Sequence, residues 1–321
     1  MPAAPRIDHA AIQHLLTRYG VRGARVQRVA HLGMQVFRVT PPRASPGEEL
    51  ALRVYLPGLD RAQIESELCW LDAMAQEGLH VPAPRADLEE QLLQPFPGTA
   101  PGEPARCAVI LRWLPGRCLS SGLQPAHLQQ VGRLMGRMHA LSQTLVASGR
   151  IASTQKTYVA DLRRWASGER ARSPHISPRA HELACAAAAR LLAELSSIPK
   201  TAPHHGYIHG DAHLWNLLFH QGRAGLIDFS DCGWGDTALE LAAALQYLKH
   251  PLPIQRAHTI AYPALRDSLL SAYAAQRTLP AHFERHVEAY IGARMVSTLE
   301  WVLADWPHIG HRAWGPAFLA G

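Results

Sequence analysis

The chain lacks the features that mark secreted, membrane-spanning or nucleic-acid-binding proteins. Its five cysteines are an odd number without CxxC spacing, so no disulfide framework is indicated. No apolar run approaches the roughly 18 residues that cross a bilayer, and no basic-then-apolar leader is recognisable. Lysine and arginine are scattered among acidic residues at a net charge of +6. These absences predict a cytoplasmic protein without nucleic-acid or membrane partners.

The chain has enough length and apolar content for two structural parts. It has 321 residues, 47% of them hydrophobic, whereas single hydrophobic cores stop growing near ~250 to 300 residues. Apolar residues alternate, as is typical of strands, over much of the chain up to about residue 112, and helical periodicity dominates afterwards. The sequence therefore predicts a β-rich part over 1–112 and a mainly helical part over 113–321.

The predicted elements follow from these two periods. In the first part, helices are expected over 8–20 and 61–77, and strands over 26–29, 36–39, 50–55, 91–94 and 107–113. In the second part, helices are expected over 125–139, 158–167, 181–196, 239–248, 264–275 and 283–303. Three consecutive strands near the beginning predict an antiparallel meander.

One segment of the second part, residues 205–236, is dense in acid, amide and imidazole side chains. Two short apolar runs within it, 217–219 and 225–227, predict strands that meet at a tight turn at Gln221-Gly222. Polar residues occur just before the first strand and just after the second. A hairpin brings these two positions to the same end, so their side chains are expected to lie close together.

The polar residues at that end are Asp211, Asn216 and Asp228. Phosphoryl transfer from a nucleotide requires a carboxylate that orients the acceptor hydroxyl and hard oxygen ligands that hold Mg²⁺ against the phosphates. These three side chains supply that set. Taken singly, an Asp or Asn beside a hairpin is more often a turn or cap residue, so the prediction depends on their joint spacing.

The same segment resembles a known family of enzymes. Residues 209–216, HGDAHLWN, match the catalytic-loop pattern of the kinase superfamily, with Gly210 where protein kinases usually have Arg. Residues 227–231, IDFSD, resemble the metal-binding segment of aminoglycoside phosphotransferases, choline kinases and their relatives. The continuation through residue 236 is most similar to the bacterial branch that contains stress response kinase A and type II homoserine kinases.

The resemblance implies an α+β fold of the protein kinase-like, two-lobed type. It also implies ATP and Mg²⁺ as cofactors, and a hydroxyl of a small molecule, such as an aminoglycoside, amino alcohol or sugar-like compound, as the acceptor. Asp211 would be the catalytic carboxylate, Asn216 and Asp228 would be metal ligands, and His209 would brace the loop.

The resemblance further implies that residues 1–112 bind the nucleotide. Arg53 takes the position of the phosphate-contacting lysine, unless it is a solvent-facing strand residue, and it would pair with Glu67, or with Glu65 if the register differs by two. The other implied nucleotide contacts are Gly33 in the turn over the phosphates and Leu111 and Trp113 in the hinge between the lobes.

Several alternatives remain open from the sequence. His209, Asp211 and His213 could form a zinc site of a hydrolase. A Ser/Thr protein kinase or a catalytically silent nucleotide-binding protein would share the motifs. The short connection after Asp228 leaves no room for a long activation segment, which favours a small acceptor. Asp236 is expected to cap the helix that follows. The chain is expected to be a monomer or homodimer.

Overall fold

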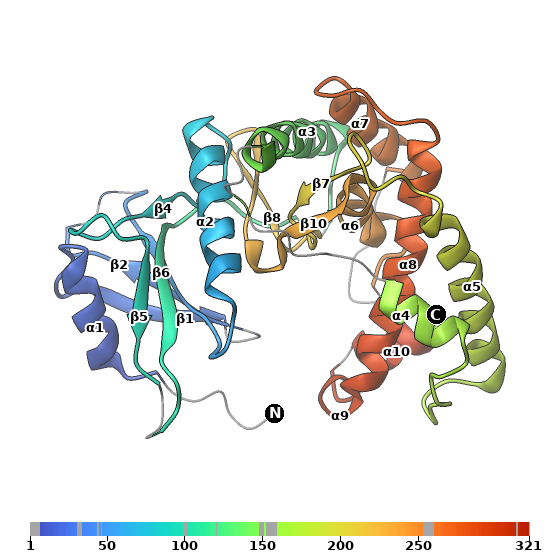
Figure 1. Cartoon of the computed structure of the whole chain (residues 1–321), viewed down its shortest axis with the longest axis horizontal. Coiled ribbons are helices and arrows are strands. Elements are labelled where there is room, and N and C mark those ends of the chain that lie inside the picture. The colour runs from blue at the N-terminus through green and yellow to red at the C-terminus, as the bar shows by residue number, and fades with distance from the viewer. Residues whose placement is uncertain are drawn as a thin grey trace. The chain divides into compact units, whose positions relative to one another are not determined.

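The computed structural model describes residues 7–30, 34–43, 45, 47–98, 102–119, 121–147, 151, 159–252, 260–312 and 314–320 (Figure 1). The chain forms two compact units. The first comprises Met1–Gly116 with Ala147–Ala152, and the second comprises Arg117–Val146 with Ser153–Gly321. None of the helices in these described ranges is both long enough and apolar enough to span a bilayer.

The first unit is built on a six-stranded antiparallel sheet in the order β1-β2-β3-β6-β4, with β5 paired to β6 (Figure 1). Its strands are β1 (Arg25–Ala30), β2 (Gln35–Thr40), β3 (Leu50–Val54), β4 (Pro84–Arg85), β5 (Leu93–Phe96) and β6 (Arg106–Arg112). Its helices are α1 (His9–Arg18) and α2 (Arg61–Gln76). The predicted meander is β1, β2 and β3.

Alternation along β3 separates an apolar core from a polar pair. Leu52 and Val54 belong to the core cluster that α1 shares with the sheet. Arg53 lies between them in sequence, so its side chain emerges on the other face, where it reaches α2. Every residue of β3 is buried, because both faces of this central strand are covered.

The second unit is mainly helical. Its long helices are α3 (Pro125–Ala147), α5 (Pro178–Ser196), α6 (Thr237–Lys249), α7 (Tyr262–Ala274) and α8 (Phe283–Ala304), and its short ones are α4 (Val159–Ala166), α9 (Trp306–Ile309) and α10 (Trp314–Ala320). Helix α6 is buried on nearly all sides and packs against α8, which also contacts α4 and α5 (Figure 1). The predicted β-rich first part and mainly helical second part are confirmed.

Two small antiparallel sheets accompany these helices. The predicted hairpin is present as β8 (Leu217–His220) and β9 (Arg223–Leu226), and Gln221 and Gly222 have φ values of 47° and 72°. Two consecutive positive φ angles favour the tight turn whose twist matches a hairpin. The second sheet pairs β7 (His205–Ile208) with β10 (Gly233–Asp236) and was not predicted.

Candidate active site

The hairpin holds the predicted site residues through backbone contacts. The Asn216 side-chain nitrogen donates to the carbonyl of Asp211 at 2.9 Å, and the Ile227 N–H donates to the carbonyl of Asn216 at 3.0 Å. These bonds connect the loop before β8 to the residue just before Asp228. Since the amide nitrogen of Asn216 is engaged, its amide oxygen is the group that remains to accept or to bind a cation.

Asp228 has an unusual backbone conformation. Its φ and ψ are 64° and 65°, in the left-handed region that Asp and Asn tolerate better than most residues. Its side chain is exposed, and Oδ1 accepts a hydrogen bond from the Ser230 hydroxyl at 3.0 Å. Non-glycine residues in this region are found in turns and also cluster at functional sites, where the surrounding structure holds them.

His209 braces the loop from inside, as predicted. The ring is fully buried and packs edge-on against Phe229, with ring centroids 4.5 Å apart. Its Nδ1 accepts the N–H of Asp211 at 3.2 Å, so the proton lies on Nε2, which donates to the carbonyl of Ile227 at 2.9 Å. Burial lowers the pKa of His209, which favours this neutral form. The ring therefore connects the Asp211 loop to the end of β9.

Both ring nitrogens of His209 thus form hydrogen bonds, so neither is available to bind zinc in the alternative hydrolase site. His213 lies near Asp211, with Nε2 3.4 Å from Oδ2. No set of three His, Cys, Asp or Glu side chains in the described ranges is arranged to hold a metal. A zinc centre formed by His209, Asp211 and His213 is therefore not supported. Mg²⁺ needs fewer protein ligands, because phosphates and water complete its shell, and the oxygens of Asn216 and Asp228 fit that chemistry.

Glu240 of α6 holds the loop before β8 through a hydrogen bond. Its side chain is fully buried, and Oε2 accepts the N–H of Gly210 at 2.9 Å. Burial raises the pKa of Glu240 to about 7, and the charge of Asp211 also raises it, while backbone N–H groups and Arg294 lower it. The catalytic segment and the following helix are thus linked by a buried carboxyl that accepts the Gly210 N–H.

A substitution of Glu240 by Gln is expected to flatten the pH dependence of stability. In the unfolded chain this carboxyl releases its proton near 4.5, whereas in the folded protein it retains it to about 7. The folded state therefore binds more protons between these values, and the wild-type free energy of unfolding falls as pH rises. Urea unfolding should show that the free energy of unfolding of the wild type, relative to that of E240Q, falls by up to about 3 kcal/mol between pH 5 and pH 8.

The matched control for that comparison is Glu182→Gln, because Glu182 is an exposed side chain on α5. Its pH profile should run parallel to that of the wild type. Parallel profiles for wild type and Glu240→Gln as well would contradict the expected proton uptake at Glu240.

Arg294 of α8 is the main site residue that the sequence did not predict. Its side chain is only 6% exposed, and its Nη2 donates to Asp211 Oδ1 at 3.0 Å. Its Nε donates to Gln246 Oε1 at 2.7 Å, which fixes the guanidinium against α6. One oxygen of Asp211 is therefore held by a buried cation, whereas the other, Oδ2, lies 3.4 Å from His213 Nε2.

Aromatic rings lie beside that carboxylate. The rings of His213, Trp215 and Tyr247 form mutual edge contacts, and those of Trp215 and Tyr247 are nearest, with centroids 4.9 Å apart. His213 and Trp215 lie two and four positions after Asp211 in the loop, and Tyr247 comes from α6. These three rings form an aromatic flank of the site in the second unit.

The predicted nucleotide residues lie in the first unit. Arg53 forms a buried ion pair with Glu67 of α2, and Tyr55 donates to the same carboxylate at 3.2 Å. The predicted pair is therefore confirmed. Glu65 instead faces solvent and pairs with Arg61. The alternative that Arg53 is solvent-facing is wrong, because only 6% of its side chain is exposed.

The two residues predicted to contact the nucleotide in the hinge, Leu111 and Trp113, already make contacts within the first unit. Leu111 is buried within β6, and the N–H of Trp113 already donates to the carbonyl of Glu49 at 2.9 Å. A contact from Trp113 to a base would have to use its ring or its carbonyl. Gly33 lies outside the described residues. The roles of Arg53, Glu67, Leu111 and Trp113 in nucleotide binding stay predictions.

Asp236 occupies the N-cap position of α6 but makes no capping bond with its side chain. Its carboxylate accepts hydrogen bonds from Lys200 at 2.6 Å and from Tyr290, and it lies 2.7 Å from His205 Nδ1. The predicted capping role is therefore wrong at the side chain, because three donors from β7 and its surroundings compete for the carboxylate. The residue ties β7, β10 and α8 together.

The architecture and the loop geometry define a two-lobed, kinase-like phosphotransferase. The sequence model of the phosphotransferase enzyme family matches residues 27–308, and the chain belongs to this family. It is an enzyme of the kinase class whose acceptor group is an alcohol. None of the curated protein sequences is significantly similar to the chain.

Solved structures share the fold at low sequence identity. An amicoumacin kinase in complex with AMP-PNP, Ca²⁺ and Ami is 18% identical, with a TM-score of 0.78, over 99% of this chain and 92% of the other. A microcompartment-associated aminopropanol kinase is 21% identical, with a TM-score of 0.76, over 98% and 94%. A choline kinase from Cryptosporidium parvum Iowa II is 17% identical, with a TM-score of 0.61, over 98% and 92%. These likenesses confirm the predicted protein kinase-like fold.

Proposed function

We propose that the protein transfers the γ-phosphoryl group of ATP to a hydroxyl of a small molecule, with Mg²⁺ as the metal. The observation that carries this proposal is the fixed relation of Asp211, Asn216 and Asp228 around one hairpin in a chain of this family. The predicted division of labour, with nucleotide binding in 1–112 and catalysis in 113–321, is part of the proposal. A cytoplasmic location and a monomeric or homodimeric state remain predictions.

The residues of the second unit would act by positioning. Arg294 holds Oδ1 of Asp211, so Oδ2 is the oxygen that can accept a hydrogen bond from the acceptor hydroxyl and orient it for attack. Asn216 and Asp228 would hold Mg²⁺, which neutralises phosphate charge when bound. His209 and Glu240 keep the loop in place through buried hydrogen bonds. The aromatic flank would exclude water from one side of the acceptor.

Two observations support a small acceptor over a protein. Residues 229–236 run directly from Asp228 through a short 3-10 turn and β10 into α6, so no peptide-docking segment follows the metal-binding aspartate. The similar structures named above are kinases of amicoumacin, aminopropanol and choline. We therefore propose an aminoglycoside, amino alcohol or sugar-like acceptor.

The test is a screen for acceptor-dependent ADP release with ATP and Mg²⁺, followed by mass spectrometry of the acceptor. An aminoglycoside, amino alcohol or sugar should gain one phosphoryl group, and EDTA should stop the reaction because the metal supplies charge neutralisation. Labelling of added proteins from radioactive ATP, with no labelled small molecule, would overturn the proposed acceptor class. Absence of any nucleotide turnover across the panel would contradict the proposed reaction.

A further inference from the structure

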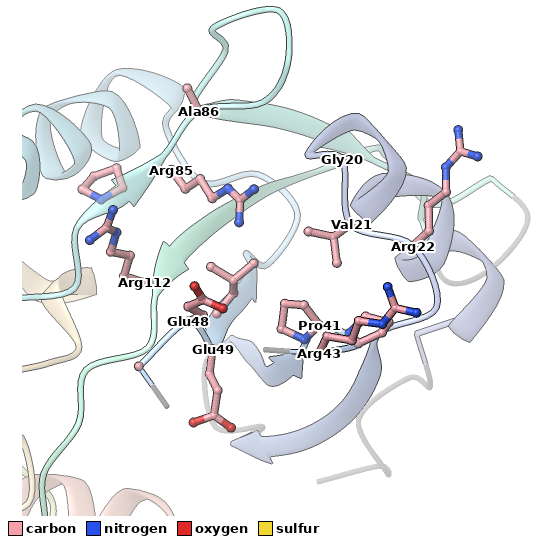
Figure 2. A pocket seen from close by; sticks show the side chains of 14 residues that line it. Gly20, Val21, Arg22, Pro41, Arg43, Glu48, Glu49, Arg85, Ala86 and Arg112 are labelled. Atoms are coloured by element: carbon pink, nitrogen blue, oxygen red, sulfur yellow. The ribbon is translucent and has the colours of Figure 1, made fainter. Parts of the chain in front are cut away.

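A hollow of the first unit lies where β2 ends and β3 begins. Its volume is about 1070 Å³, and its walls come from the residues that follow α1, from residues 41–43 and 47–50, from β4 and from the last residue of β6 (Figure 2). The predicted nucleotide residue Arg53 is not among its lining residues, because it faces α2 and pairs with Glu67.

Arginine dominates the charge of this hollow. Figure 2 shows Arg43 and Arg112 on opposite sides, with Arg85 and Glu48 between them. Arg22 also belongs to the lining, but in this view its side chain extends outward. The lining thus contains four arginines and two glutamates.

The carboxylates of the lining are already engaged. Glu48 Oε2 accepts the N–H of Ser45 at 2.8 Å. Glu49 extends away from the middle of the hollow and accepts a two-pronged hydrogen bond from Arg38, with Nε at 2.9 Å and Nη2 at 2.5 Å. Neither glutamate forms an ion pair with an arginine of the lining among the described residues, and the lining has more arginines than glutamates, so the surplus charge there is positive.

The arginines, in contrast, have side-chain N–H groups that form no hydrogen bond within the described part of the chain. Arg85 donates from Nη2 to the carbonyl of Tyr19 at 3.0 Å, which anchors its guanidinium and leaves its other N–H groups. Arg43 and Arg112 make no side-chain hydrogen bond or ion pair with any residue that the structure describes. A guanidinium is always charged and presents N–H groups in a planar fork that matches phosphate oxygens.

We propose that this hollow binds a small organic phosphate ester. The phosphate would lie between the forks of Arg85 and Arg112, and a hydroxyl of the ligand would donate to Glu48. Val21, Pro41, Pro42, Leu50 and Pro84 provide apolar walls for the organic part. The volume suits a ligand of metabolite size, since small-molecule pockets are typically about 300 to 1,000 Å³. This binding does not depend on the proposed phosphotransfer.

The test is calorimetric titration of glucose 6-phosphate, with EDTA present so that no metal-dependent site forms. Wild type should bind glucose 6-phosphate and show no heat with glucose, because the guanidinium groups recognise the phosphate. The double variant Arg85→Gln/Arg112→Gln should bind at least tenfold more weakly. Arg179→Gln, an exposed arginine on α5 that carries the same type of charge loss, should bind like the wild type. Circular dichroism of each variant checks that the fold is retained.

A further comparison distinguishes binding in this hollow from binding in the active site. Asp211→Asn should bind glucose 6-phosphate as tightly as the wild type, because Asp211 belongs to the second unit. Absence of binding by the wild type would overturn the proposal. So would equal affinity of the wild type and a folded Arg85→Gln/Arg112→Gln variant, or loss of binding in Asp211→Asn alone. If the double variant does not fold, the single variant Arg112→Gln, which changes an exposed side chain, decides by the same tenfold criterion.

Discussion

Asp211→Asn is expected to lower kcat for phosphoryl transfer by about 10²- to 10⁴-fold, the range found when a positioned acid or base is removed. Asn has the same shape, and its amide oxygen can still accept from Arg294 Nη2, so the loop should keep its conformation. What the variant loses is the second anionic oxygen, which orients the acceptor hydroxyl. Steady-state kinetics with an acceptor from the screen would measure the loss, and ATP affinity should change little.

The matched control is Asp267→Asn, an exposed carboxylate on α7 that pairs only with its neighbour Arg266 among the described residues. It removes the same charge from the second unit away from the hairpin, so kcat should stay within about twofold, because exposed ion pairs contribute little. If Asp211→Asn retained kcat within the same twofold range, the carboxylate would not be the catalytic group.

Asp228→Asn is expected to abolish the Mg²⁺-dependent part of ATP affinity. Asparagine tolerates a φ of 64° as well as aspartate does, so the backbone at this position should be unchanged and only the charge is lost. Removing a charged metal ligand should weaken ATP binding with Mg²⁺ by at least about 10- to 100-fold, the cost reported even for residues that only support a ligand. Titration calorimetry of ATP with and without Mg²⁺ measures this difference.

Asp231→Asn provides the control within the same short turn. Asp231 is exposed and carries the same charge, but the family resemblance does not assign it to the metal. It should retain the Mg²⁺ dependence of ATP binding. If Asp228→Asn bound ATP with the Mg²⁺ dependence of the wild type, Asp228 would not be a metal ligand. If the wild type bound no ATP under either condition, the proposed nucleotide site itself would be wrong.

The part of the site that sequence could predict is the part that local structure determines. Asp211, Asn216 and Asp228 are separated by one hairpin, and the alternation of its strands together with the turn at Gln221 fixes which end they share. The Arg53–Glu67 pair was predicted from the family resemblance, with Glu65 left open as the alternative, and the structure decides for Glu67, which is buried, whereas Glu65 is exposed. For the hairpin, the period of two residues carries the information.

The rest depended on contacts between distant segments. Arg294 reaches Asp211 across 83 positions of sequence, and a lone arginine in an amphipathic helix gives no sign of its partner. The pairing of β7 with β10 was missed because each strand is short and rich in glycine, so neither alternates clearly. The capping prediction for Asp236 failed for the same reason, since Lys200, His205 and Tyr290 come from outside α6.

The direct passage from Asp228 through β10 into α6 leaves residues 229–236 little freedom to rearrange. A different conformation of this segment would break the ladder to β7 and disturb the start of a helix that is buried on nearly all sides, so it would cost free energy. Residues 229–236 are therefore held in one conformation for as long as β7, β10 and α6 stay folded.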